Sequence, residues 1–130
     1  MIDHLSLGVS DLARSGAFYD AVLAPLGYAR LFGNERGIGY GPPGARDEAF
    51  AILPAGDRAK PPGQGWHLAF KAANREAVDS FHAIALQNGA LDEGGPGLRP
   101  KYGPDYYAAF VRDPEGYRLE AVCHEAQVSK

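Results

Sequence analysis

The repeat HLSLGVSDLARSGAFYDAVLAPLGY at residues 4–28 and HLAFKAANREAVDSFHAIALQNGA at residues 67–90 decides the fold of this chain. Placed one over the other, the two stretches align His4 with His67 and Phe18 with Phe81 at the same offset, with one residue dropped before the final glycine. A repeat of this kind is a supersecondary unit that needs a neighbour to bury its apolar face. We therefore expect two related units that pack against each other.

Each repeat begins as a strand and continues as a helix. Alternation of apolar and polar residues predicts a strand over residues 2–9, and helical spacing predicts a helix over residues 11–26 with Ser10 as its N-cap. In the second repeat, residues 66–72 read as a strand, and Asn74 is the expected N-cap of the helix that follows. About three further strands are expected after each helix, which gives an α+β fold class.

The strands after the helices are bounded by turn residues. YARLFG, RGIGYG and EAFAILPA read as strands of the first half, the last two joined as a hairpin. In the second half, DEGGPGLRPKYGPD reads as a long turn-rich loop, and YYAAFVRD and YRLEAVCH form a hairpin around Pro114-Glu115-Gly116. The carboxylate of Glu120 then lies within an apolar strand, where an ionised group needs a partner.

Composition bounds the class of protein. The chain has 130 residues and is 45% hydrophobic, which suits one domain over residues 1–130. Its formal net charge is −3, and its lysines and arginines are scattered, so nucleic acid and membrane surfaces are not the expected partners. Cys123 is the only cysteine, and the start of the chain lacks the pattern of a signal peptide, so we expect a cytoplasmic protein.

The chain resembles the vicinal oxygen chelate superfamily, which contains glyoxalase I, extradiol dioxygenases, fosfomycin-resistance transferases and bleomycin-binding resistance proteins. The resemblance covers nearly the whole chain, and FVRDPEGYRLEAV at residues 110–122 is its most specific motif. It implies two paired βαβββ modules, about residues 1–56 and 65–125, that form a curled mixed sheet around a cavity. It also implies a homodimer.

The resemblance implies a metal site as well. The family carries metal ligands on the first strand of each module and on the last strand of the second, and His4, His67 and Glu120 stand at these positions. Two imidazoles and one carboxylate suit a divalent ion such as Fe, Mn, Zn or Ni and leave coordination positions open for a substrate. The repeat gives an independent reason to pair the histidines. For each histidine alone, a structural role remains the alternative.

One position departs from the glyoxalase I pattern. Aligning EAFAILPA with GYRLEAVC places Ile52 where those relatives carry a second glutamate, so lactoylglutathione lyase activity is disfavoured. The leading hypothesis is a divalent-metal-dependent lyase, dioxygenase or transferase that acts on a small oxygen-rich substrate. The alternative is a metal-free protein that binds a drug or metabolite in the same cavity. No catalytic residue is assigned.

Further candidates concern substrate binding. Cationic and phenolic side chains beside the expected cavity predict contacts with an oxygen-rich or aromatic small molecule, or else packing over the sheet edge. At most one of the two adjacent tyrosines should point inward, because neighbouring residues of a strand face opposite sides. His82 is expected to be solvated, and Cys123 to be a small buried residue. The candidate substrate-binding residues are Arg99, Tyr102, Tyr106 and Tyr107.

Overall fold

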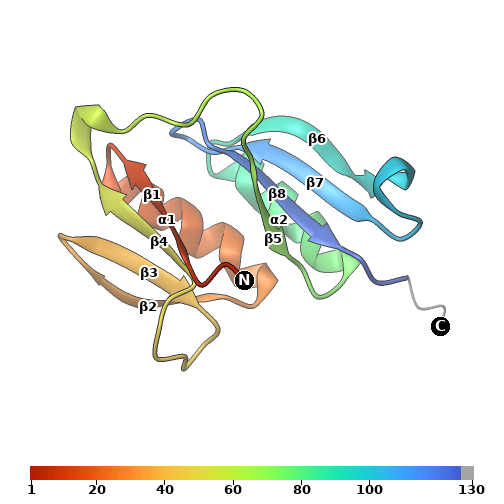
Figure 1. Ribbon diagram of the computed structural model, residues 1–130, viewed down its shortest axis with the longest axis horizontal. Coiled ribbons are helices and arrows are strands. Elements are labelled where there is room, and N and C mark those ends of the chain that lie inside the picture. Colours follow the sequence, from red (N-terminus) through yellow and green to blue (C-terminus); the bar gives the residue numbers. More distant parts are fainter. Residues whose placement is uncertain (127–130) are drawn as a thin grey trace.

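The computed structural model describes residues 1–126, which form two α-helices and eight strands in two four-stranded mixed sheets (Figure 1). The predicted α+β class is therefore confirmed, and the sheets do not close into a barrel. In the described part of the chain, no helix is both long and apolar enough to cross a membrane.

The elements of the first half are β1 (Leu5–Val9), α1 (Leu12–Leu23), the 3-10 helix η1 (Ala24–Leu26), β2 (Ala29–Asn34), β3 (Gly37–Gly41), β4 (Phe50–Pro54) and η2 (Gly56–Arg58). Those of the second half are β5 (Leu68–Lys71), α2 (Arg75–Gln87), β6 (Leu91–Leu98), η3 (Pro100–Tyr102), β7 (Tyr107–Arg112) and β8 (Arg118–Cys123).

The two sheets have the same topology, as the repeat predicts. Sheet A has the order β1-β4-β3-β2, and sheet B has the order β5-β8-β7-β6. In each sheet the first and last strands of the unit pair in parallel, and the other pairs are antiparallel. Leu5 pairs with Phe50 in sheet A, and its counterpart Leu68 pairs with Leu119 in sheet B. This register gives the residue equivalences between the two halves.

The helix starts follow from capping chemistry, with one correction. Asn74 caps α2 as predicted, because its side chain accepts a hydrogen bond from the backbone N–H of Ala77. The cap of α1 is Asp11 and not Ser10, since the Asp11 carboxylate accepts from the backbone N–H of Arg14. Ser10 instead contacts the second half of the chain.

β6 was not predicted. Its sequence, LDEGGPGL, has the glycine and proline content of a loop, yet it pairs antiparallel with β7. The register shifts between Asp92 and Gly94 and again between Gly94 and Gly97, so the strand bends at its glycines. Gly94 has a φ of 152°, which other residues rarely adopt. Pairing with a neighbouring strand therefore outweighs the low strand propensity of the residues.

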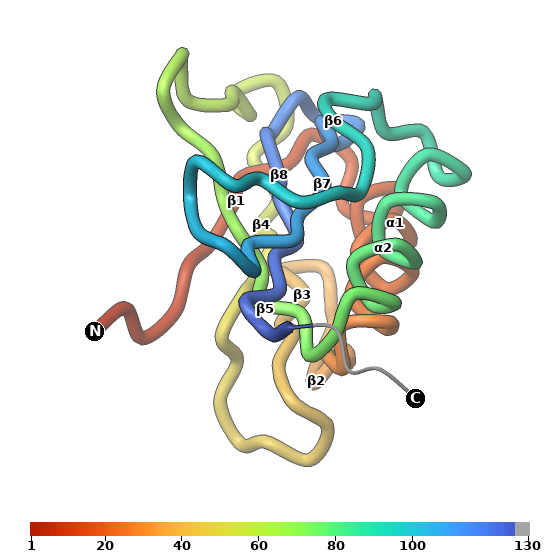
Figure 2. Tube along the Cα trace, turned by 90° about the vertical axis from the view of Figure 1, so that its right-hand side faces the viewer, coloured from red at the N-terminus to blue at the C-terminus, as the bar shows by residue number. Residues whose placement is uncertain are grey.

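Both helices lie on one side of the strands (Figure 2). The core fills the space between helices and sheets, and it joins the two halves through ring contacts such as Phe50 with Phe70, whose centroids are 5.3 Å apart. We call the opposite side of each sheet its open face. Alternation along β8 places Leu119 and Ala121 in the core and Glu120 on the open face of sheet B.

The turn between β7 and β8 docks the second half on the first. Tyr19 of α1 donates to the buried carboxylate of Asp113, and the hydroxyl of Tyr117 donates to the carbonyl of Gly8 at 2.6 Å. Glu115 accepts from the backbone N–H of Ser10 at 2.9 Å and from its hydroxyl at 2.6 Å. We call this set of contacts the turn clamp.

Candidate functional site

The buried carboxylate of Glu120 is the centre of the candidate site. Its side chain is 1% exposed on the open face of sheet B. Oε1 lies 2.9 Å from Nε2 of His67 on the adjoining segment before β5, and Oε2 accepts a short hydrogen bond from the hydroxyl of Tyr106. Burial and the adjacent carboxylate raise the pKa of Tyr106 to about 12, so its hydroxyl stays protonated and donates. His67 and Tyr106 therefore satisfy the two oxygens of this buried carboxylate.

Aromatic side chains surround this trio. Phe110 lies opposite Glu120 in the β7–β8 register, and its ring centroid is 6.5 Å from that of His67. The ring of Tyr106 contacts His124 at 5.0 Å and Tyr102 at 5.3 Å. The carboxylate of Glu120 and the imidazole of His67 are thus surrounded by aromatic side chains.

His4 does not join this group within one chain. It precedes β1, its side chain is 57% exposed, and its Nδ1 lies 2.6 Å from the carboxylate of Asp3. The hydrogen bond and charge of Asp3 raise the pKa of His4. No group of three or more His, Cys, Asp or Glu side chains placed to hold a metal ion occurs among residues 1–126. Of the three predicted ligands, the structure brings together His67 and Glu120.

The counterpart of Glu120 in the first half is Ala51, not Ile52. Ala69 pairs with Glu120, and its counterpart Ser6 pairs with Ala51. Ile52 instead lies in the core with no exposed surface. The sequence alignment was wrong by one residue, and in a strand that error exchanges the two faces. Either residue leaves the first half without a carboxylate at this position.

Of the four predicted substrate-binding residues, one lies elsewhere. Tyr107 points to the helix side, where its hydroxyl donates to Asp79 of α2 at 2.6 Å. The prediction for Tyr107 is corrected, because the alternation that directs Tyr106 to Glu120 directs its neighbour away. Arg99 and Tyr102 lie near the site, with the Arg99 guanidinium carbon 5.4 Å from the centre of the Phe110 ring.

The structure also corrects the expectation for His82. This residue of α2 is buried, and its Nε2 lies 3.0 Å from the carboxylate of Asp92 in β6. This contact could not be predicted from the sequence, because β6 itself was not predicted. Cys123 is buried, as expected. The ring of Trp66 packs against that of Tyr117, with the centroids 5.7 Å apart.

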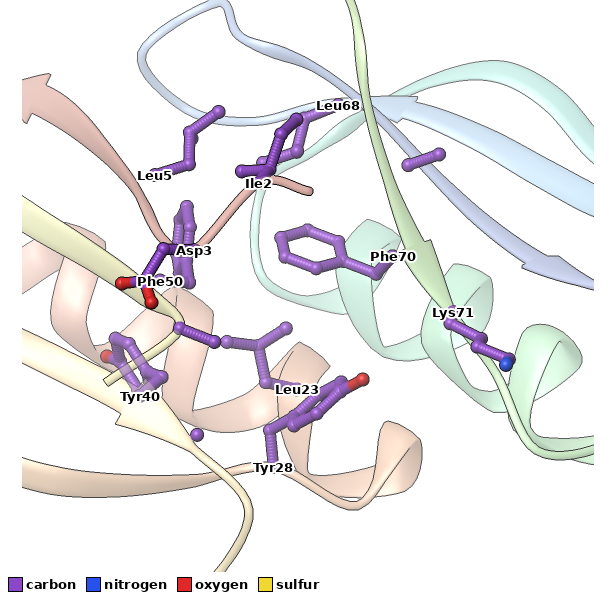
Figure 3. A pocket seen from close by; sticks show the side chains of 13 residues that line it. Ile2, Asp3, Leu5, Leu23, Tyr28, Tyr40, Phe50, Leu68, Phe70 and Lys71 are labelled. Atoms are coloured by element: carbon purple, nitrogen blue, oxygen red, sulfur yellow. The ribbon is translucent and has the colours of Figure 1, made fainter. Parts of the chain in front are cut away.

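A separate cavity of about 310 Å³ lies between the two halves (Figure 3). Leu5, Leu23 and Phe50 line it from the first half, and Leu68 and Phe70 line it from the second. Neither His67 nor Glu120 lines this cavity. The side chains of Leu68 and Phe70 face the core side of β5, away from the candidate site.

Comparison with known proteins assigns the family. The sequence matches the model of the Glyoxalase/Bleomycin resistance protein/Dioxygenase superfamily over residues 1–121. The chain belongs to this superfamily. None of the curated proteins compared with the chain matches it.

Solved structures agree with the superfamily assignment. A glyoxalase/bleomycin resistance protein from Albidiferax ferrireducens T118 is 35% identical, with a TM-score of 0.79 over 93% of this chain and 96% of that one. A superfamily enzyme from Burkholderia phytofirmans PsJN shares the fold at 17% identity, with a TM-score of 0.71 over 95% and 98% of the two chains. A superfamily member from Sphaerobacter thermophilus DSM 20745 does so at 20% identity, with a TM-score of 0.61 over 95% and 96%.

Proposed function

We propose that the chain is a divalent-metal-dependent enzyme that acts on a small oxygen-rich substrate, and that His67 and Glu120 hold the ion. The observation that carries the proposal is the 2.9 Å separation of Nε2 and Oε1. Two ligand atoms that bind one ion at about 2.1 Å and at right angles lie about 3.0 Å apart, so the pair suits adjacent coordination positions. Superfamily members commonly bind divalent metals.

We further propose that a second copy of the chain supplies the third ligand, His4. His4 continues the alternation of β1, so it shares the open face of sheet A with Ser6. That face also carries exposed apolar side chains, since Phe32 is 45% exposed and Leu53 is 43% exposed. A two-fold arrangement that places sheet A of one copy against sheet B of the other would cover these side chains and complete the site twice.

The residues of the chain have distinct roles in this proposal. The Tyr106 hydroxyl orients the Glu120 carboxylate, as partners of metal ligands commonly do. The Phe110 ring forms an apolar wall beside His67. A bound ion would supply Lewis-acid polarisation of the substrate oxygens. Ala51 cannot bind a metal or transfer a proton, which argues against the glyoxalase I reaction.

Metal analysis of protein purified without chelators tests the proposal. We expect close to one divalent ion per chain, and its loss in His67→Ala. His124→Ala is the matched control, because this histidine lies on the same face and its ring packs against that of Tyr106 at 5.0 Å. Metal-free protein that takes up no ion, or a His67→Ala variant that retains it, refutes the metal site.

A mixing experiment tests the origin of the third ligand. His4→Ala and His67→Ala should each lack metal, whereas refolding the two together in equal amounts should restore about a quarter of the wild-type occupancy. Half of the resulting dimers are mixed, and each mixed dimer has one intact site out of two. A site built within one chain would show no recovery.

The second candidate is a metal-free binding protein. It is favoured by the hydrogen bonds of Glu120, because His67 and Tyr106 engage both carboxylate oxygens. In that case, ligand-induced thermal stabilisation would be unchanged by EDTA. The metal-dependent proposal predicts instead that EDTA abolishes it.

A further inference from the structure

The guanidinium of Arg99 lies against the glycines of β6. Its Nη2 donates to the carbonyl of Gly95 at 2.7 Å, and its guanidinium lies over the Phe110 ring. A Cβ atom would lie 3.4 Å from Nη2 if added to Gly94 and 3.2 Å from Nη1 if added to Gly97. The side chain therefore occupies space that the absence of neighbouring side chains provides, and it stays beside the ring that also contacts His67.

Arg99 has no carboxylate partner among the described residues. By contrast, Arg112 of β7 and Arg118 of β8 both pair with the carboxylate of Glu93. Guanidinium carries five N–H donors in a planar fork, and Gly95 accepts from one nitrogen of Arg99. The remaining donors suit a planar or tetrahedral oxyanion.

Lys101 adds a second cation to the same region. Its Nζ lies 5.1 Å from the centre of the Tyr102 ring, which stacks near Tyr106, and no ion pair is formed with a described carboxylate. Among residues 1–126, Glu120 is the carboxylate of the candidate site, and it is buried with both oxygens hydrogen-bonded. The region is thus locally cationic although the chain carries a net charge of −3. Such local charge attracts anionic ligands and discriminates against neutral ones.

We propose that the ligand of this site is a small molecule with a carboxylate, phosphate or phosphonate group, which Arg99 binds while an apolar or aromatic part lies along Phe110. The proposal rests on the open face of sheet B as the binding site, which is part of the proposed function. It does not rest on a bound metal. Arg99 is here the specificity-determining residue, and Lys101 contributes charge at the rim.

Calorimetric titration with phenylphosphonate, benzoate and the neutral benzyl alcohol tests the proposal. We expect both anions to bind more tightly than benzyl alcohol, and Arg99→Gln to weaken the anions by roughly tenfold to a hundredfold, as the loss of charge-assisted hydrogen bonds does. Arg99→Lys should recover part of the affinity, because it restores the charge without the fork. Comparison of the two anions identifies the preferred oxyanion.

Arg58→Gln is the matched control, because Arg58 is an exposed arginine in η2, outside the site, and its loss changes the net charge equally. Equal affinities of the Arg99 and Arg58 variants for the anions overturn the proposal, as does a wild-type chain that binds neither anion at millimolar concentration. Thermal unfolding of each variant shows that it is folded. Titrations with and without EDTA separate the two proposals. Arg99-dependent binding that survives EDTA supports the anion site and shows that this binding needs no metal, whereas the metal analysis described above tests the ion by itself.

Discussion

Replacement of Glu115 by alanine should destabilise the whole chain, although this residue lies in a turn. Its carboxylate accepts from the Ser10 N–H at 2.9 Å, from the Ser10 hydroxyl at 2.6 Å and from Arg14 Nη2 at 2.5 Å. The side chain of Glu115 is 5% exposed and that of Arg14 is 49% exposed. The two bonds from Ser10 therefore account for most of the effect, and the half-exposed ion pair adds little.

The expected loss is about 2–4 kcal/mol in the free energy of unfolding, because the two bonds from Ser10 to the carboxylate are charge-assisted. For a chain of this size, that corresponds to a fall in Tm of roughly 6–16 °C. Urea unfolding monitored by circular dichroism measures the first quantity, and calorimetry the second. Glu35→Ala is the control, since Glu35 is exposed in the β2–β3 turn.

The effect should also depend on pH. Burial alone would raise the pKa of Glu115, but hydrogen bonds from Ser10 and the charge of Arg14 lower it below its ordinary value of 4.5. A carboxylate whose pKa is lower in the folded state stabilises the fold above pH 4.5, and this contribution is lost as the pH falls through the folded-state value. The stability difference between wild type and Glu115→Ala should therefore shrink in acid. A Glu115→Ala variant as stable as Glu35→Ala at pH 7, or a difference that grows in acid, would refute the reasoning.

Three further predictions concern the site and the core. Tyr106→Phe removes the hydroxyl that orients Glu120 and should weaken metal binding about tenfold to a hundredfold. Competition with a chelating dye measures the metal affinity, and an unchanged affinity argues against the orienting role. Tyr107→Phe removes the hydrogen bond to Asp79 and should lower the free energy of unfolding by about 0.5–1.5 kcal/mol, measured with urea. Metal affinity should not change. A change in metal affinity would contradict the placement of the Tyr107 hydroxyl on the helix side. Leu68→Phe places a larger side chain in the cavity between the halves, and filling the cavity should raise the free energy of unfolding by about 0.5–2 kcal/mol in urea unfolding. A lower free energy of unfolding would mean that the cavity cannot accept the phenyl ring.

Local patterns predicted the framework of the fold. The repeat indicated two matching units, the alternation in residues 2–9 and 66–72 indicated β1 and β5, and Asn74 correctly marked the start of α2. These signals are local, because capping and alternation depend on residues only a few positions apart.

Other features depend on contacts between distant residues. β6 carries loop-like residues and becomes a strand because it pairs with β7, and the burial of His82 follows from that pairing. The family resemblance, not the repeat, placed His67 and Glu120 in one site, and the structure brings these two residues together. Ala51 and Ile52 could not be distinguished without the register of the strands. Alternation predicted that Tyr106 and Tyr107 face opposite sides of the sheet, but it could not show which of the two faces the site.

The turn clamp has a consequence for how the chain folds as it is synthesised. Ser10 lies just before α1, yet its partner Glu115 is made more than a hundred residues later. During translation, the first half therefore emerges with the start of α1 lacking these contacts, and the cavity-lining surface of Leu5 and Phe50 lacks its neighbours from β5. The two halves share one fold but should not fold as two independent events. Pulse-labelling hydrogen exchange would then find protection of α1 and β8 appearing in the same step.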